Sequence, residues 1–293
     1  MTYRGRFAPS PTGPLHMGSL VAATGSYLQA VAHHGHWLLR IEDIDTPRCV
    51  PGATDSILHT LEIMGFEWHG PVLYQSTRQD AYEAALQQLR ALNLCYPCSC
   101  SRSELQLAAG TVHDGEELRY PGWCRIQPRH AEGPFAWRFR VPDAETGFTD
   151  AIYGYQCICL QDTIGDFVIK RRDDLFAYQL AVVVDDAEQG VTEVVRGADL
   201  LLNSPRQIAL QRALRLNTPA YVHLPLVLDA HGKKLSKSHA APELSGQTCT
   251  QLLWQALNFL QQHPPVELQH ASLTVLWSWA KENWQLKSLI LHK

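Results

Sequence analysis

The chain has 293 residues, of which 45% are hydrophobic and 18% are charged, which is enough for one large domain or two ordinary ones. Its net charge of −4 excludes a global positive field, so a nucleic-acid partner would have to use a local patch. No apolar run reaches the ~20 residues of a membrane span, and the N-terminus lacks the apolar core of a signal peptide. We therefore expect a cytoplasmic protein whose eight cysteines are reduced, without disulfides.

A strand is expected from Tyr3 to Ala8, because this short run ends at Pro9 and Pro11, which deny a sheet its N–H donors. Apolar residues then recur at three- and four-residue spacing from about Gly18, which indicates a helix. A helix N-terminus has free N–H groups and partial positive charge, so it binds anions such as phosphates, and His16 stands at its mouth. These residues alone leave open an ordinary strand–helix loop with an incidental histidine.

A second buried strand is expected over 36–41, and strand, helix, strand implies a parallel unit whose ligands collect beyond the carboxyl ends of its strands. Glu42, Asp43 and Asp45 follow this strand and fall on the same rim as His16. They are able to hold an ammonium group, a ribose or a metal, or else to cap the next helix and pair with Arg48. Helices over 52–65 and 79–93, with a short strand over 72–75, complete one half of a doubly wound α/β layer.

Cysteines then gather in a pattern that suggests zinc. Cys98 and Cys100 are separated by one residue and Cys124 follows later, and three thiolates with a fourth ligand suit a tetrahedral zinc ion. The candidates for the fourth ligand are Tyr120, Cys95 and His113. The alternative is three small buried hydrophobic residues.

Short strands are expected over 135–141, 148–153 and 155–160, in an insert that separates the two halves of the α/β layer. Cys157 and Cys159 alternate on the last of these strands and are predicted to face a core. The second half returns at Asp166, and residues 175–184 are too continuously apolar for a solvent-facing helix. A strand over 191–195, a helix over 205–216 and a strand over 221–228 follow. The rim of this half carries Tyr178, Asp185, Asp186, Arg196 and Asp199.

A lysine-rich loop follows the last strand. It contains Lys233, Lys234 and Lys237, and it fails the Walker pattern because Val227 stands where a glycine is required. Three lysines in five residues concentrate enough positive charge to bind a phosphate group. The alternative is a solvated surface loop. The remaining segment, 246–293, fits two or three helices.

Two motifs that are far apart in the sequence resemble motifs of the same enzyme family. His16-Met17-Gly18-Ser19 and Lys234-Leu235-Ser236-Lys237-Ser238 resemble the ATP-binding motifs of the class I aminoacyl-tRNA synthetases. The stretches 6–13, 40–45 and 223–228 look like the glutamyl branch of that family. The resemblance implies that glutamate and ATP form glutamyl-adenylate and pyrophosphate with Mg²⁺. It implies ATP contacts from His16, Gly18, Ser19, Lys234, Ser236 and Lys237, and glutamate contacts from Arg6, Ala8, Ser10, Glu42, Tyr178 and Arg196.

The short segment after Ser238 and the cysteine pattern resemble a truncated branch, the glutamyl-Q tRNA(Asp) synthetases. That resemblance implies activation of L-glutamate without tRNA and its transfer to queuosine at the wobble position of tRNA(Asp). It also implies one structural zinc per chain, held by Cys98, Cys100, Tyr120 and Cys124, with Tyr120 favoured over Cys95 and His113. The alternatives are a truncated glutamyl-tRNA synthetase that charges the 3′ end of tRNA(Glu), and a non-catalytic module that binds RNA or regulates another protein.

The expected organisation is a Rossmann-like, doubly wound parallel sheet with an inserted zinc-bearing α+β subdomain. Residues 1–94 and 166–240 form the two halves of the catalytic domain, 95–165 form the insert, and 241–293 form a short helical region without an anticodon-binding domain. We expect a monomer. Lys170, Arg171, Arg172 and the C-terminal helices are the candidate RNA surface.

Overall fold

The computed structural model describes residues 2–109, 118–130, 132–227 and 247–290. His113 and the lysine motif with Lys234, Ser236 and Lys237 lie outside the described residues. Within the described ranges, no helix is long and apolar enough to cross a membrane.

The first half of the chain builds a parallel three-stranded sheet. It consists of β1 (Arg4–Phe7), β2 (His36–Ile41) and β3 (Leu73–Tyr74), in the order β1-β2-β3. The crossover helix α1 (Met17–Ala32) joins β1 to β2, and α2 (Ala53–Ile63) and α3 (Gln79–Ala91) follow. Single 3-10 turns lie at η1 (Thr46–Arg48) and η2 (Gln75–Thr77). The register pairs Arg4 with His36 and Phe7 with Leu39, so β1 and β2 end at the same edge.

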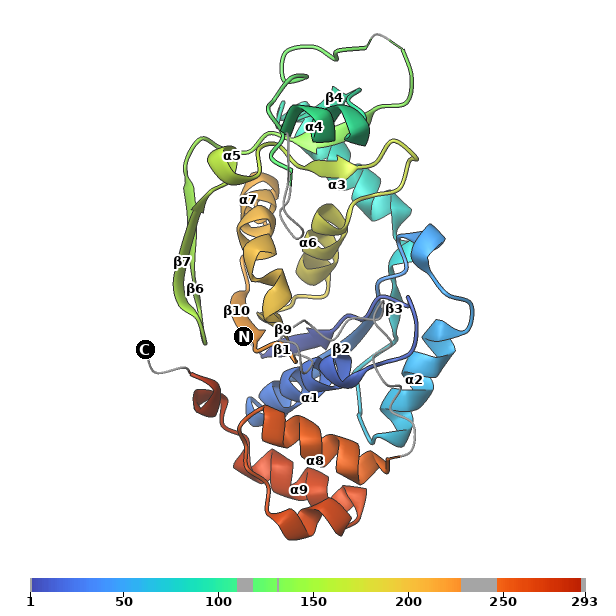
Figure 1. Cartoon of the computed structure of the whole chain (residues 1–293), viewed down its shortest axis with the longest axis vertical. Coiled ribbons are helices and arrows are strands. Elements are labelled where there is room, and N and C mark those ends of the chain that lie inside the picture. The colour runs from blue at the N-terminus through green and yellow to red at the C-terminus, as the bar shows by residue number, and fades with distance from the viewer. Residues whose placement is uncertain (1, 110–117, 131, 228–246, 291–293) are drawn as a thin grey trace.

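A second sheet has the order β7-β6-β10-β9, from β6 (Glu145–Asp150), β7 (Gly154–Cys159), β9 (Glu193–Gly197) and β10 (Ala220–Leu224). β10 is parallel to β9 and β6, whereas β6 and β7 form an antiparallel hairpin. β1 lies beside β9, and the backbone N–H of Thr192 donates to the carbonyl of Arg4 at 2.9 Å (Figure 1). The doubly wound α/β fold is therefore confirmed.

A small antiparallel sheet stands at one end of the molecule, with β4 (Cys95–Cys98), β5 (Ala136–Phe139) and β8 (Val168–Lys170) in that order (Figure 1). Helices α4 (Arg102–Ala109) and α5 (Leu160–Thr163) accompany it. The sequence predicts that the segment from Asp166 begins the second half of the α/β layer, but β8 pairs with β5 instead. β6, expected in the insert, pairs with β10. The division of the chain into four ranges stays a prediction.

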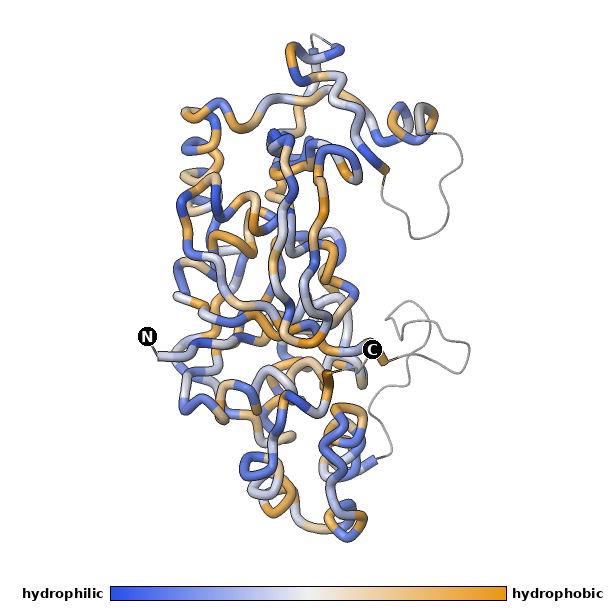
Figure 2. The backbone as a smooth tube through the Cα atoms, turned by 90° about the vertical axis from the view of Figure 1, so that its left-hand side faces the viewer, coloured by the Kyte–Doolittle hydropathy of each residue, from blue (hydrophilic) through white to orange (hydrophobic). Residues whose placement is uncertain are grey.

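The β6–β7 hairpin lies on the surface, where its two strands run side by side facing the viewer in Figure 2. Cys157 is exposed and Cys159 is half-buried. The prediction that both face a core is wrong, because β7 is an edge strand whose Cys157 face meets solvent. All eight cysteines are free thiols.

The apolar run before Asp185 forms α6 (Tyr178–Glu188), which is a buried helix, packed beside α7 (Ser204–Leu214). A 3-10 segment, η3 (Ala198–Asn203), leads from β9 into α7. Leu180, Ala181, Val182 and Val183 are almost fully enclosed, which explains why no polar stripe interrupts the sequence there.

The C-terminal segment forms α8 (Cys249–Phe259), η4 (Val266–His270), α9 (Leu273–Asn283) and η5 (Leu286–Leu289), at the opposite end from β4 (Figure 1). These helices share one apolar core with α1. The indole N–H of Trp277 donates to the Met64 carbonyl at 2.8 Å, and that of Trp284 donates to Gln29 Oε1 at 3.0 Å. The expected two or three helices are confirmed, and they pack as part of the main body.

Candidate functional site

A cavity of about 380 Å³ opens where β1, β9 and β10 end and α1 begins. This is the edge where ligands of parallel α/β sheets bind. Nine residues that the resemblance assigns to ATP or glutamate line it, together with the predicted rim residue Asp199, and they come from both halves of the chain. The nine are Arg6, Ala8, Ser10, His16, Gly18, Ser19, Glu42, Tyr178 and Arg196.

Arg6 is held by a buried network of ion pairs. Its Nε lies 3.1 Å from Asp186 Oδ1, and Arg40 Nη1 approaches the same oxygen at 2.8 Å. Arg40 Nη2 also lies 3.4 Å from Glu42 Oε1. Burial acts to raise the pKa of Asp186, but Arg6 and Arg40 outweigh it and hold that pKa below its usual value. Asp186 therefore stays ionised and holds Arg6 in place on the cavity wall.

Glu42 is the buried carboxylate of the cavity, since it is only 9% exposed, whereas the second carboxylate of the lining, Asp199, is exposed. Burial raises its pKa, while Arg40 and Arg6 act in the opposite direction. A buried carboxylate with a raised pKa gains when a cationic group binds beside it, because the cation favours the ionised form. Glu42 is thus suited to an ammonium group.

Arg196 faces Glu42 and Arg6 from the other half of the chain, on β9. Its Nη1 lies 3.4 Å from the hydroxyl of Tyr178, the first residue of α6. Two guanidinium groups, the carboxylates of Glu42 and Asp199 and one phenol therefore share a single cavity. That set complements a small dicarboxylate that also carries an ammonium group.

The end of the cavity where the sequence predicts nucleotide binding lies at the start of α1. His16 is the N-cap residue, and its Nδ1 accepts the backbone N–H of Ser19 at 3.3 Å. A neutral ring that accepts at Nδ1 carries its proton on Nε2, where it serves as a donor to an anion. A Cβ on Gly18 would lie 3.0 Å from His16 Cε1, so glycine lets the ring sit over the helix start.

Asp43 and Asp45 make contacts within the protein. Asp43 accepts the backbone N–H and the hydroxyl of Ser76 at 2.8 and 2.6 Å. Asp45 lies 2.6 Å from Arg48 Nε and 3.1 Å from Arg171 Nη1. The predicted ion pair with Arg48 is therefore confirmed for Asp45. The predicted cap of the next helix is wrong, because Asp45 makes no side-chain capping hydrogen bond at η1 and Gly52 is the N-cap residue of α2.

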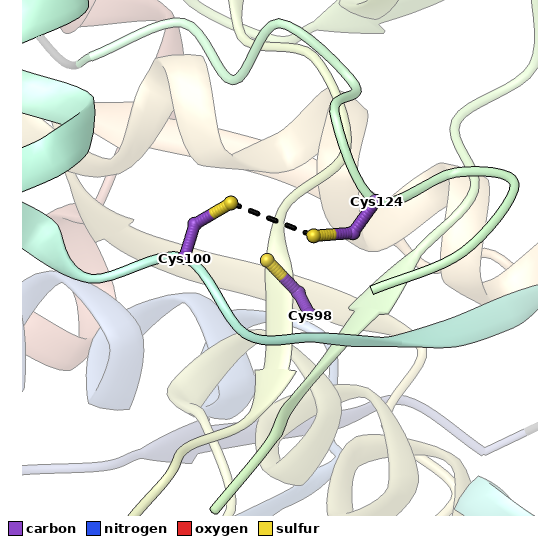
Figure 3. Close-up of side chains that lie close together, drawn as sticks. All are labelled: Cys98, Cys100 and Cys124. Carbon is purple, nitrogen blue, oxygen red and sulfur yellow. Dashed lines mark hydrogen bonds between the residues drawn. The ribbon is translucent and has the colours of Figure 1, made fainter. Parts of the chain in front are cut away.

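The sulfur atoms of Cys98, Cys100 and Cys124 point toward one another (Figure 3). They lie within 4.8 Å of one another and are buried, with 3.5 Å between Cys100 Sγ and Cys124 Sγ. A zinc ion with Zn–S distances of ~2.3 Å at tetrahedral angles separates two sulfur ligands by about 3.8 Å. The cluster therefore fits a zinc ion.

Tyr120 stands at the fourth corner of this cluster. Its hydroxyl oxygen lies 3.4 Å from Cys98 Sγ and 3.8 Å from Cys100 Sγ. Cys95 is three residues before Cys98 on β4, so it faces the opposite side and packs in the core with Phe139. This geometry favours Tyr120 over Cys95, while the ligand set itself stays a prediction.

The surroundings of Cys98 and Cys124 suit negative thiolates. Arg138 donates from Nε to Cys98 Sγ at 3.2 Å and lies 3.7 Å from the centre of the Tyr120 ring. Burial raises the pKa of the Cys124 thiol, but hydrogen bonds from Tyr120 and from the backbone of Arg129 outweigh it and lower that pKa to about 6. Metal-binding thiols must be deprotonated, so the environment of Cys124 favours binding. Burial raises the pKa of the Cys100 thiol to about 12, so this thiol would need the charge of the metal ion itself to lose its proton.

The comparisons with known proteins agree with this site. The family described as "tRNA synthetases class I (E and Q), catalytic domain" matches residues 2–249. The "Glutamyl-Q tRNA(Asp) synthetase" of Geobacter sulfurreducens is 54% identical, over 96% of this chain and 91% of that protein. The protein of the same name from Dechloromonas aromatica is 52% identical, over 96% and 94%. The chain belongs to the glutamyl-Q tRNA(Asp) synthetase family.

A solved structure supports this placement. The crystal structure of the glutamate-tRNA synthetase from Elizabethkingia anophelis superposes with a TM-score of 0.81 at 26% identity, over 99% of this chain and 67% of that one. The resemblance to the glutamyl-Q tRNA(Asp) synthetase family that the motifs indicate is thus confirmed. The class I catalytic domain implies an ATP-dependent ligase that uses Mg²⁺.

Two buried residues, Asp150 and Ser204, escape detection in the sequence, and His223 appears there only as the first residue of the stretch 223–228, with no role of its own. Asp150 and His223 form a hydrogen bond of 2.7 Å behind Arg196, and Ser204 also contacts Arg196. Asp150 lies in a segment that we assign to the insert, so no local pattern links it to β9. Asp186 is visible as a rim acid, but its pairing with Arg6 is not.

The basic run Lys170 to Arg172 is largely neutralised. Lys170 Nζ lies 3.2 Å from Glu83 and 2.8 Å from Asp174, and Arg171 Nη2 lies 2.5 Å from Asp173. These pairs weaken the case for this run as an RNA surface, which stays a prediction.

Proposed function

We propose that the chain activates L-glutamate with ATP, without tRNA, and transfers the glutamyl group to queuosine at the wobble position of tRNA(Asp). The observation that carries the proposal is the shared cavity of Arg6, Arg196 and Glu42, beside His16 at the start of α1. The names of relatives at 54% and 52% identity support the acceptor.

At the amino-acid end, Arg6 and Arg196 receive the two carboxylates, Glu42 holds the α-ammonium group, and Tyr178 and Ser10 donate hydrogen bonds. The backbone of Ala8 adds to this wall. Glutamine matches glutamate in shape but lacks its side-chain charge. It would leave a buried guanidinium without its partner, and breaking such a pair costs ~2–5 kcal/mol.

At the nucleotide end, His16, Ser19 and the N-terminus of α1 receive the phosphates, and Gly18 lets adenine lie close to the backbone. Lys234, Ser236 and Lys237 of the lysine motif complete this set. A glutamate carboxylate oxygen attacks the α-phosphorus and pyrophosphate leaves, so no side chain needs to act as a nucleophile. The donors stabilise charge that moves onto pyrophosphate, and removal of one preorganised donor typically costs ~10²–10³ in rate.

In the second step, a hydroxyl group of queuosine attacks the activated carbonyl carbon and AMP leaves. Zinc held by Cys98, Cys100, Cys124 and Tyr120 would be structural, tying the end of β4 to residues 120–124. The protein is proposed to act as a cytoplasmic monomer, and sedimentation equilibrium would test the oligomeric state.

The deciding experiment supplies labelled glutamate and ATP with either queuosine-containing or queuosine-free tRNA(Asp). We expect glutamate-dependent ATP–pyrophosphate exchange without tRNA, and label only on the queuosine-containing tRNA. Equal labelling of both tRNAs would overturn the acceptor, and labelling of unmodified tRNA(Glu) would favour charging of a 3′ end. Absence of glutamate-dependent ATP–pyrophosphate exchange would favour the remaining alternative, a non-catalytic module that binds RNA or regulates another protein.

A further inference from the structure

A chain of three buried residues stands behind the cavity wall. Asp150 Oδ2 lies 2.7 Å from His223 Nδ1, and Arg196 Nε lies 3.1 Å from His223 Nε2. Asp150 is 1% exposed, His223 0% and Arg196 5%. The three residues come from β6, β10 and β9, which are neighbours in the second sheet.

The contacts assign the tautomer of His223. A carboxylate only accepts hydrogen bonds, so Nδ1 carries the proton that faces Asp150. Arg196 only donates, so Nε2 must offer its lone pair to the guanidinium. Burial and the charge of Arg196 lower the pKa of His223 although Asp150 acts to raise it, which agrees with a neutral ring. The ring stacks on Tyr221, with parallel planes 10° apart and centroids 6.0 Å apart.

The remaining contacts of Arg196 fix its other nitrogens. Nη2 donates to Ser204 Oγ at 2.9 Å and to the Leu200 carbonyl at 3.4 Å. Nη1 points to Tyr178 on the cavity wall at 3.4 Å. Ser204 Oγ also lies 3.2 Å from His223 Nε2, so it is part of the same arrangement. Every nitrogen of the guanidinium group is thus oriented before a ligand arrives.

We propose that Asp150 and His223 are positioning residues, which lock Arg196 in the orientation that binds a carboxylate of the substrate. This inference rests on the proposed function, in which that substrate is glutamate. An arginine fixed in advance loses less conformational freedom on binding than a mobile one. Asp150 therefore acts on substrate binding through two side chains without touching the substrate.

Asp150→Asn is the sharpest probe. Asp150 Oδ1 accepts the backbone N–H groups of Ile152 and Tyr153 at 3.0 and 2.9 Å, and an amide oxygen preserves these two contacts. Oδ2 also accepts the backbone N–H of His223 at 3.0 Å, and an amide nitrogen at that position loses this contact. The amide nitrogen would then face His223 Nδ1 and donate to it. The ring proton would move to Nε2 and oppose the Arg196 Nε–H, so Arg196 would lose its orientation.

We expect Asp150→Asn to raise the KM for glutamate by about 10- to 100-fold in ATP–pyrophosphate exchange, because a displacement near 1 Å costs up to ~10²-fold. The KM for ATP should stay unchanged, whereas the Tm should fall because the backbone N–H of His223 loses its acceptor. Asp143→Asn, an exposed aspartate that precedes β6, is the matched control and should change neither KM. An unchanged KM for glutamate in Asp150→Asn would overturn the inference, whereas a wild-type protein without glutamate-dependent exchange would overturn the proposed function.

A double-mutant cycle separates positioning from a general structural effect. Lysine has no Nε–H at the position of Arg196 Nε, so Asp150→Asn should have no further effect on glutamate binding in an Arg196→Lys background. Binding of labelled glutamate by equilibrium dialysis provides the readout if exchange becomes too slow. Additive losses would overturn the inference.

If Asp150→Asn does not fold, His223→Gln and His223→Leu provide the test. Glutamine keeps an acceptor oxygen for Arg196 and leucine does not. Glutamate should bind more tightly to His223→Gln than to His223→Leu. Equal affinity of the two variants for glutamate would overturn the inference.

Discussion

Arg6→Met tests the amino-acid end of the cavity with little change in volume. Arg6 is 3% exposed, and its Nε and Nη2 lie 3.1 and 3.4 Å from Asp186. After the substitution, Asp186 still has Arg40 Nη1 at 2.8 Å, so a buried carboxylate is not left without a cation. We therefore expect the fold to survive while the receptor for one glutamate carboxylate is lost.

Loss of one partner of a buried charge pair costs ~2–5 kcal/mol, and each 1.4 kcal/mol is tenfold, so kcat/KM for glutamate should fall about 30- to 5,000-fold. ATP–pyrophosphate exchange at varied glutamate and glutamine concentrations measures this loss, and the preference for glutamate should shrink. Arg4→Met is the control on the same strand, because exposed Arg4 instead donates to the Gln189 carbonyl at 2.9 Å. Wild-type kcat/KM in Arg6→Met, or an equal loss in the control, would refute the assignment of Arg6.

Glu42→Gln should raise the KM for glutamate by about 10- to 100-fold, since a hydrogen bond to a charged group contributes ~1.5–3 kcal/mol. Burial raises the Glu42 pKa, so in the wild type kcat/KM should fall as pH drops below that pKa and the carboxylate takes a proton, and this acid limb should vanish in the variant. Cys100→Ser should lower zinc content from one per chain and lower the Tm, whereas exposed Cys157→Ser should leave both unchanged, as checked by metal analysis and calorimetry. Trp277→Phe removes a buried indole N–H donor, so it should destabilise the protein by about 1 kcal/mol in urea unfolding, with exchange retained; wild-type stability would contradict the docking of α9.

Local patterns in the sequence predict most elements of the fold. The buried strand over 36–41 is confirmed to the residue, and helices are confirmed at 53–63, 79–91 and 204–214 within a few residues of the prediction. These succeed because apolar spacing, prolines and glycines act over a few residues. The motifs around Arg6, His16 and Arg196 predict residues that line one cavity.

Pairing between distant strands is what the sequence does not reveal. β8 pairs with β5, and β6 pairs with β10 through Tyr221 and Asp150. The alternation of Cys157 predicts a strand correctly, but it cannot tell which face meets solvent, since that depends on the partner strand. Asp150 supports Arg196 across 46 residues of sequence for the same reason.

The placement of β6 makes the segment from 95 to 165 inseparable from the catalytic sheet. An insertion whose two ends lie close together can be deleted without loss of the surrounding sheet. This insertion cannot, because its strand β6 pairs with β10 of the catalytic sheet. Excision would expose the edge of β10 and remove the carboxylate beneath His223. We therefore expect that deletions in this segment are tolerated only in the small sheet and the cysteine cluster. Deletions that remove the β6–β7 hairpin are expected to disrupt the catalytic sheet.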